Sequence, residues 1–215
     1  MKHLLLLGTG GTIACKRGEN GLTPLLTGDE LLSYVPDAKK FCEVETVQVL
    51  NIDSTNMHPK HWLKLAQVLE DNYDNYDGFV ICHGTDTMAY TASALSFMLE
   101  NLSKPVILTG SQLPIGTLRT DGKENLITAI EIAAAKNANG TAMVPEVCIF
   151  FENHLMRGNR TTKINAENFN AFRSFNYPAL ARVGIHIKYE PNLIHKPDPT
   201  KALKPHYLFD TNVVI

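Results

Sequence analysis

Three stretches of small polar residues each follow a short apolar run that we predict to be a buried strand. The first is the glycine-rich turn at residues 8–11, with Thr12 directly behind it. The second is residues 83–87, where a strand gives way to a helix, and the third is residues 51–56. In α/β proteins, ligands bind beyond the carboxyl ends of parallel strands. The three stretches therefore predict one site at which hydroxyl, carboxylate and free backbone N–H groups face a small polar molecule.

The glycine turn differs from the phosphate-binding loops that it superficially resembles. Ile13 stands where the dinucleotide fingerprint G-x-G-x-x-G has its third glycine, and no G-K-[ST] follows. The G-x-S-x-G turn of serine hydrolases is absent as well. For the threonines and aspartate at residues 85–87, capping of a helix is an open alternative to a role in a site, because these are favoured N-cap residues.

Three histidines could carry other chemistry. His58 and His61 have the i, i+3 spacing that a metal ion could use, but no third ligand with suitable spacing is apparent, so we predict no metal. His83 stands beside a glycine and could be a base. We favour a packed, hydrogen-bonded core histidine at this position.

Predicted strands and helices alternate along the chain. Most of the strands are continuously apolar, as expected when both faces of a sheet are covered. Helices are indicated by a capping box at residues 27–30, by Pro59 in a first turn, and by helical spacing of apolar residues over 87–101 and 124–137. This order predicts an α/β domain with a mostly parallel sheet flanked by helices. The predicted strands are residues 3–7, 44–50, 79–82, 106–109, 147–151 and 183–188.

The composition is that of an ordinary globular protein, with 215 residues, of which 44% are hydrophobic and 20% charged. The net charge of -2 and the scattered basic residues argue against nucleic acid or an anionic membrane as a partner. No apolar segment approaches the roughly 18 residues that span a bilayer, and the leucines at 4–7 are too few for a signal peptide. Four widely spaced cysteines favour a reducing cytoplasm over a disulfide framework.

The texture of the sequence changes after residue 188. Four prolines fall between residues 191 and 205, and an apolar run then follows. We predict a first domain over residues 1–188, an extended linker over 189–206, and the start of a second, truncated domain at 207–215.

Taken together, these segments resemble the bacterial-type L-asparaginase family. The family's first signature, T-G-G-T-I-A, stands here at residues 9–14, and its second, G-x-hydrophobic-x-x-H-G-T-D-T-hydrophobic, is matched by residues 78–88. The R-G-N-R-T-T-K segment at 157–163 is similar to that of the cytoplasmic type I branch. The resemblance implies the family's N-terminal catalytic domain, a flavodoxin-like three-layer fold, with the C-terminal domain truncated.

By this resemblance, Thr12 is the first nucleophile, and it forms a covalent β-aspartyl ester with asparagine. Thr85, Asp86 and Lys163 are the second catalytic group, which deprotonates the attacking hydroxyl or the deacylating water. A threonine hydroxyl is a poor nucleophile without a base, and a lysine amine serves as a base only when it is desolvated or joined to a hydroxyl network. The resemblance leaves open which threonine attacks first.

The family also implies the residues that hold the substrate and the absence of any metal or organic cofactor. Asp86 accepts the α-ammonium of the substrate, and Ser54 receives its α-carboxylate. The remaining implied binding residues are Asp53, Thr55, Thr85 and Ser111, the last through its backbone carbonyl. One departure stands out, because Leu22 occupies the place of a tyrosine that family members usually carry on a lid.

Three functions are compatible with the sequence. The resemblance favours an L-asparagine amidohydrolase that acts on a small-molecule substrate, L-asparagine or else L-glutamine, and forms a homodimer or homotetramer at full length. The amidase subunit of a tRNA-dependent amidotransferase shares both signatures. A non-catalytic amino-acid-binding module would keep the pocket without turnover, and the Leu22 substitution keeps this alternative open.

Overall fold

The computed structural model describes residues 1–18, 21–208 and 210. Most of the segment 207–215, predicted as the start of a second domain, therefore lies outside the described residues. Within them, no helix combines the length and apolar character that crossing a membrane requires.

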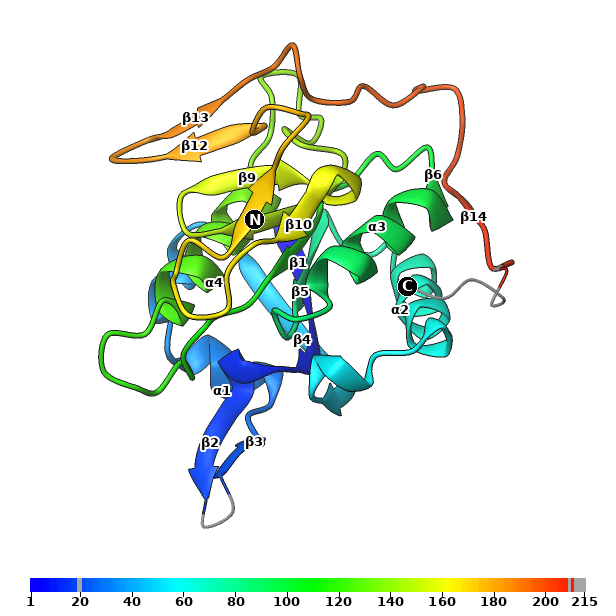
Figure 1. The fold of residues 1–215 in the computed structure, drawn as a ribbon. Helices are drawn as coiled ribbons and strands as arrows, with labels where there is room; N and C mark the ends of the chain where they lie inside the picture. The colour runs from blue at the N-terminus through cyan, green and yellow to red at the C-terminus, as the bar shows by residue number, and fades with distance from the viewer. Residues whose placement is uncertain (19–20, 209, 211–215) are drawn as a thin grey trace.

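A central sheet of eight strands runs through the molecule in the order β13-β12-β9-β8-β7-β5-β1-β4 (Figure 1). The strands β4, β1, β5, β7 and β8 pair in parallel, and β9, β12 and β13 extend the sheet by antiparallel pairing. Among the described residues, three two-stranded sheets lie outside it: β2-β3, β6-β14 and β10-β11. The strand bounds are β1 His3–Gly10, β2 Cys15–Gly18, β3 Gly21–Pro24, β4 Glu43–Ile52, β5 Gly78–Cys82, β6 Leu99–Glu100, β7 Val106–Thr109, β8 Val147–Phe151, β9 His154–Arg157, β10 Thr161–Lys163, β11 Phe172–Ser174, β12 Ala181–Val183, β13 Ile187–Tyr189 and β14 Lys204–Pro205.

Helices cover both faces of the sheet and bury two apolar cores (Figure 1). Because successive side chains of a strand point to opposite faces, Leu4 and Leu6 of β1 join the core beneath α1 and α4, whereas Leu5 and Leu7 join the core beneath α2 and α3. This three-layer α/β arrangement confirms the predicted fold class. The helices are α1 Gly28–Ser33, α2 Pro59–Asp71, α3 Met88–Met98 and α4 Gly122–Ala134, with short 3-10 helices η1 Thr12–Ala14, η2 Pro36–Lys40, η3 Ser54–Asn56 and η4 Gly158–Arg160.

Local signals in the sequence place the helix starts well. The Thr27 hydroxyl accepts from the Glu30 backbone N–H, and the Glu30 carboxylate accepts from the Thr27 backbone N–H, which is the predicted capping box. Pro59 occupies the first turn of α2, as predicted. The end of α3 comes earlier than predicted, because Leu99 and Glu100 leave the helix and pair with β14.

The predicted strand at residues 183–188 is wrong. The chain instead reverses at residues 184–186, so that β12 and β13 form a hairpin, and Ile185 is 97% exposed at its tip. Alternating apolar residues across this segment match a strand's period of two, but Gly184 interrupts it. The sequence alone does not distinguish a hairpin from a continuous strand at this segment.

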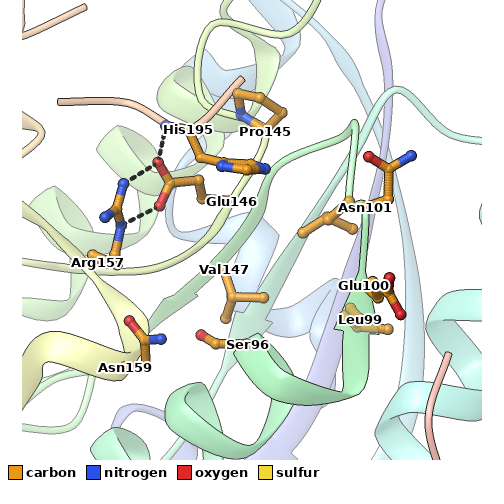
Figure 2. A pocket seen from close by; sticks show the side chains of 11 residues that line it. Ser96, Leu99, Glu100, Asn101, Pro145, Glu146, Val147, Arg157, Asn159 and His195 are labelled. Atoms are coloured by element: carbon orange, nitrogen blue, oxygen red, sulfur yellow. Dashed lines mark hydrogen bonds and ion pairs between the residues drawn. The ribbon is translucent and has the colours of Figure 1, made fainter. Parts of the chain in front are cut away.

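The segment after β13 lies against the first part of the chain. The Glu146 carboxylate accepts from Arg157 Nε at 2.6 Å and Nη2 at 2.9 Å, and it also accepts the His195 backbone N–H (Figure 2). Arg157 Nη2 further donates to the Leu193 carbonyl at 2.8 Å. Glu146, Arg157 and His195 border a cavity of about 280 Å³ between the end of α3 and the start of β8, and its lining contains no predicted site residue (Figure 2). The division into domain and linker stays a prediction.

Replacing Glu146 by Gln should destabilise the fold. The Glu146 side chain is 7% exposed and that of Arg157 is 21% exposed, so the change leaves a largely desolvated charge without its partner. We expect a loss of about 3 kcal/mol in the free energy of unfolding, measured with urea, which is the low end for a broken buried pair because Arg157 keeps some contact with solvent. The control is Asp37→Asn, which removes an exposed pair with Lys40 and should change stability by less than about 0.5 kcal/mol. Equal losses in both variants would contradict the role of the buried pair.

Candidate active site

Glycines allow the turns after β1, β4 and β5 to touch. A Cβ atom on Gly11 would lie 2.3 Å from the Gly84 backbone nitrogen, and one on Gly84 would lie 2.6 Å from the Ser54 hydroxyl oxygen. Gly11 also has a φ of 74°, in the left-handed region that favours glycine. Thr12 directly follows Gly11, and Thr85 directly follows Gly84, so this contact brings the two signature segments together.

Lys163 joins these turns from the far end of the chain. Its Nζ donates to Thr85 Oγ1 at 2.8 Å and to Asp86 Oδ1 at 2.6 Å. The Lys163 side chain is 16% exposed, whereas that of Asp86 is 54% exposed, so the amine is enclosed on the protein side and its partner faces outward. An amine, a hydroxyl and a carboxylate thus meet within hydrogen-bond distance, which is an arrangement able to move a proton. The capping alternative for these residues finds no hydrogen bond in its support, because α3 shows no side-chain cap.

Two residues to which sequence reasoning gave no role complete the surroundings of Thr85. The Thr85 hydroxyl donates to Gln112 Oε1 at 3.1 Å, and the Gln112 amide in turn donates to the Asn168 carbonyl at 3.0 Å. The Asp121 carboxylate accepts the backbone N–H groups of Gln112 and Leu113. Burial raises the pKa of Asp121 above its ordinary value. In the sequence, Gln112 ends the segment T-G-S-Q at residues 109–112, which gives no indication of what the glutamine contacts.

The segment after β4 contributes one buried and two exposed side chains. Ser54 is buried, and its carbonyl accepts from the Thr87 hydroxyl at 2.7 Å. Asp53 and Thr55 bond to each other, with the carboxylate accepting the Thr55 N–H and hydroxyl at 2.8 Å each. These hydrogen bonds lower the pKa of Asp53. Ser54 therefore reaches the Gly84 turn, while the Asp53 carboxylate caps η3.

Two further positions singled out in the sequence are Ser111, next to Gln112, and Leu22, on a hairpin. Ser111 is buried, and its hydroxyl donates to the Leu113 carbonyl, so the side chain serves its own loop. Gly110, the residue before it, packs closely against the His83 carbonyl. Leu22 lies on β3 of the β2-β3 hairpin opposite Arg17 and is 55% exposed.

The histidines take structural positions. His83 is fully buried and hydrogen-bonded at both ring nitrogens, in agreement with the core interpretation. Burial lowers its pKa to about 4, so the ring is neutral. His61 Nδ1 accepts the His58 backbone N–H at 3.0 Å, so their i, i+3 spacing serves the start of α2. Among the described residues, no three His, Cys, Asp or Glu side chains gather as a metal ion would require.

Comparison with known proteins places the chain in a family. The model of the family described as "Asparaginase, N-terminal" matches residues 3–195. L-asparaginase 1 of Escherichia coli K12 is 48% identical over 193 residues, which are 87% of this chain and 55% of the relative. The solved structure of L-asparaginase I from Vibrio cholerae is 42% identical, with a TM-score of 0.84, and the match covers 95% of this chain and 61% of that one. The chain therefore belongs to the asparaginase family.

The chain is also similar to a subunit of a tRNA-dependent amidotransferase. A glutamyl-tRNA(Gln) amidotransferase subunit of Pyrococcus abyssi is 36% identical over 193 residues, which are 85% of this chain and 42% of the relative. The chain thus spans about half the length of the curated relatives that it matches.

Replacing Gly84 by Ala should force apart the turns that meet at this residue. The new Cβ would lie 2.6 Å from Ser54 Oγ and 3.2 Å from Gly11 Cα, so the turns must separate. We expect a loss of about 1–3 kcal/mol in stability, read from urea unfolding. The matched control is Gly18→Ala in β2, where the nearest atom lies 3.9 Å away and stability should not fall. An unchanged midpoint for Gly84→Ala would show that the turns do not need this contact.

The buried His83 should make stability depend on pH. Its pKa is about 4 in the folded protein, below the ordinary value of 6.5, so the unfolded chain binds more protons between these pH values. The stabilisation is fully present above pH 6.5 and is lost as the pH falls towards 4, by up to about 3 kcal/mol. Urea unfolding from pH 7 to pH 4.5 should show a shallower decline for His83→Gln than for the wild type. Parallel declines would mean that His83 is protonated in the folded state.

Proposed function

We propose that the site hydrolyses the side-chain amide of L-asparagine to give L-aspartate and ammonia. The observation that carries the proposal is the meeting of Lys163 Nζ with Thr85 Oγ1 at 2.8 Å and with Asp86 Oδ1 at 2.6 Å, beside the turn that presents Thr12. Membership of the asparaginase family supports the same reaction class.

In the first half-reaction, the Thr12 hydroxyl oxygen attacks the carboxamide carbon of the substrate. Its proton passes to the cluster of Thr85 and Lys163 and from there to the departing nitrogen, which leaves as ammonia. The C–N bond breaks and an ester forms between Thr12 and the β-carboxyl of the substrate. For this relay, Lys163 must first release a proton, and the Thr85 O–H must turn from Gln112 towards the lysine nitrogen.

In the second half-reaction, the same cluster takes a proton from water, and the water oxygen attacks the ester carbon. The ester bond to Thr12 breaks, the proton returns to the threonine oxygen, and aspartate leaves. The exposed Asp86 carboxylate would bind the substrate α-ammonium. Asp53, Ser54 and Thr55 would bound the amino-acid head group, with Ser54 facing the α-carboxylate, and the Ser111 carbonyl would lie near the amide.

The rest of a family chain would complete this site. Because the match covers only 55% of L-asparaginase 1 of Escherichia coli, we propose that a further domain and a second protomer contribute groups to the pocket, and we expect slow turnover by residues 1–215 alone. A cytoplasmic location and a homodimer or homotetramer belong to the same proposal.

The second candidate is an amidase subunit of a tRNA-dependent amidotransferase, favoured by the P. abyssi relative. A clear preference for L-glutamine over L-asparagine would favour that candidate.

Replacing Lys163 by Met should remove most of the turnover and leave the fold intact. The variant keeps the length of the side chain but removes the donor to Thr85 and Asp86. We expect kcat for L-asparagine to fall by about 10²–10⁴-fold, with Thr12→Ala at least as severe, in a coupled assay of ammonia release. D-asparagine and L-glutamine are assayed in parallel to define the substrate.

The matched control is Lys16→Met, which removes an exposed pair with Glu30 and should change kcat less than about twofold. A Lys163→Met enzyme with near wild-type kcat would eliminate the amine as the base. Ammonia release that survives Thr12→Ala unchanged would eliminate the proposed nucleophile.

A further inference from the structure

A chain of hydrogen bonds links α2 to the turn that carries Thr85. The Trp62 indole N–H donates to Thr91 Oγ1 at 3.0 Å. Thr91 Oγ1 lies 2.9 Å from His83 Nε2, and His83 Nδ1 lies 2.7 Å from the Gly84 carbonyl oxygen. Thr91 and His83 are fully buried.

The donor and acceptor of each hydrogen bond in this series follow from the chemistry of the groups. A carbonyl oxygen only accepts, so His83 Nδ1 carries the proton and donates to Gly84. The ring is neutral, so Nε2 carries no proton and accepts the Thr91 O–H. The Thr91 oxygen then accepts from the Trp62 indole, which can only donate. The bonds therefore run one way, from Trp62 through Thr91 and His83 to the Gly84 carbonyl.

The last acceptor in the chain belongs to the peptide that precedes Thr85. A peptide unit is planar, so holding the Gly84 oxygen also sets the plane that contains the Thr85 nitrogen and Cα. The other faces of Gly84 lie against Gly11 and Ser54, which offer close packing. A held plane limits where the Thr85 Cα can lie, and the Thr85 side chain extends from that atom to its contact with Lys163.

Thr91 has an alternative that it does not use. A threonine in a helix commonly returns its hydroxyl to the carbonyl four residues earlier. In α3 the Thr87 carbonyl accepts the Thr91 backbone N–H, while the Thr91 hydroxyl bonds to His83 instead. The Thr91 hydroxyl of α3 is therefore used to hold His83, which lies in the turn before the helix.

We propose that Trp62, Thr91 and His83 are positioning residues that fix the Gly84–Thr85 peptide and thereby aim the Thr85 hydroxyl at Lys163. The catalytic consequence rests on the proposed function, whereas the geometric consequence does not. The relay itself touches no substrate.

The test removes one hydroxyl from the middle of the relay. Thr91→Val keeps the shape of the side chain but leaves His83 Nε2 without its donor, and Thr91→Ser keeps the hydroxyl. Nitrogen-15 NMR of the histidine ring should show the Nδ1–H tautomer in the wild type and in Thr91→Ser, and a mixture of tautomers in Thr91→Val. The Lys163 ammonium protons should exchange with water at least ~5-fold faster in Thr91→Val, because their Thr85 acceptor is displaced.

Kinetics then report the catalytic consequence. We expect kcat to fall by ~10–100-fold in Thr91→Val while KM changes less than about threefold, and Thr91→Ser should restore most of the loss, since a small misplacement of a reacting group is enough. The control is Ser96→Ala, which removes a hydroxyl bond to the Ala92 carbonyl on the same helix and should alter none of these readouts. A Thr91→Val protein with the wild-type tautomer and wild-type Lys163 exchange overturns the relay. A wild type that shows no turnover, with the NMR changes intact, counts against the proposed function and leaves the relay supported.

Discussion

The contact between two glycine turns is the constraint on which the rest of the site depends. Gly11 and Gly84 lie in the turns that follow two neighbouring parallel strands, β1 and β5, and their backbones meet with no room for a side chain on either. The two strands are hydrogen-bonded neighbours, and a Cβ atom on Gly11 would lie 2.3 Å from the Gly84 backbone nitrogen, so these two turns approach this closely only without a side chain there. Thr12 and Thr85, each one residue beyond a glycine, thereby stand on adjoining turns. The pairing of β1 with β5 brings the two turns near each other, and the glycines allow their backbones to come into contact.

Around this contact, each polar group of the cluster has a partner that limits its freedom. Thr85 receives a hydrogen bond from Lys163 and gives one to Gln112, and Gln112 is held through its backbone by Asp121. Partners drawn from separate segments of the chain thus restrain one hydroxyl. Such preorganisation is what a nucleophilic mechanism needs, because groups held in place require little rearrangement during the reaction. Asp86 is more accessible to solvent than Lys163, because its side chain is 54% exposed and that of Lys163 is 16% exposed.

Local patterns predicted the parts of the structure that local physics determines. Apolar runs located β1, β5, β7 and β8, and the capping box located the start of α1. The meeting of Lys163 with Thr85 and Asp86 followed from the family resemblance, since residues 77 and 78 positions apart leave no pattern of their own. Gln112 was missed because an amide carries no periodic signal, and the 184–186 reversal was missed because strand and hairpin share the same alternation. In each case the outcome depends on a contact with a segment distant in the sequence. The pairing of β14 with β6, which ends α3 early, is an example.

The central claim is that one ligand meets all three turns at the carboxyl edge of the sheet. Titration of the chain with L-aspartate, the proposed product, followed through backbone amide NMR signals, tests it most directly. The account predicts shifts concentrated at residues 11–12, 53–55 and 84–86, with no change around the cavity that Glu146 and Arg157 border (Figure 2). Shifts centred on that cavity, or an absence of shifts at the three turns at saturating ligand, would contradict the account.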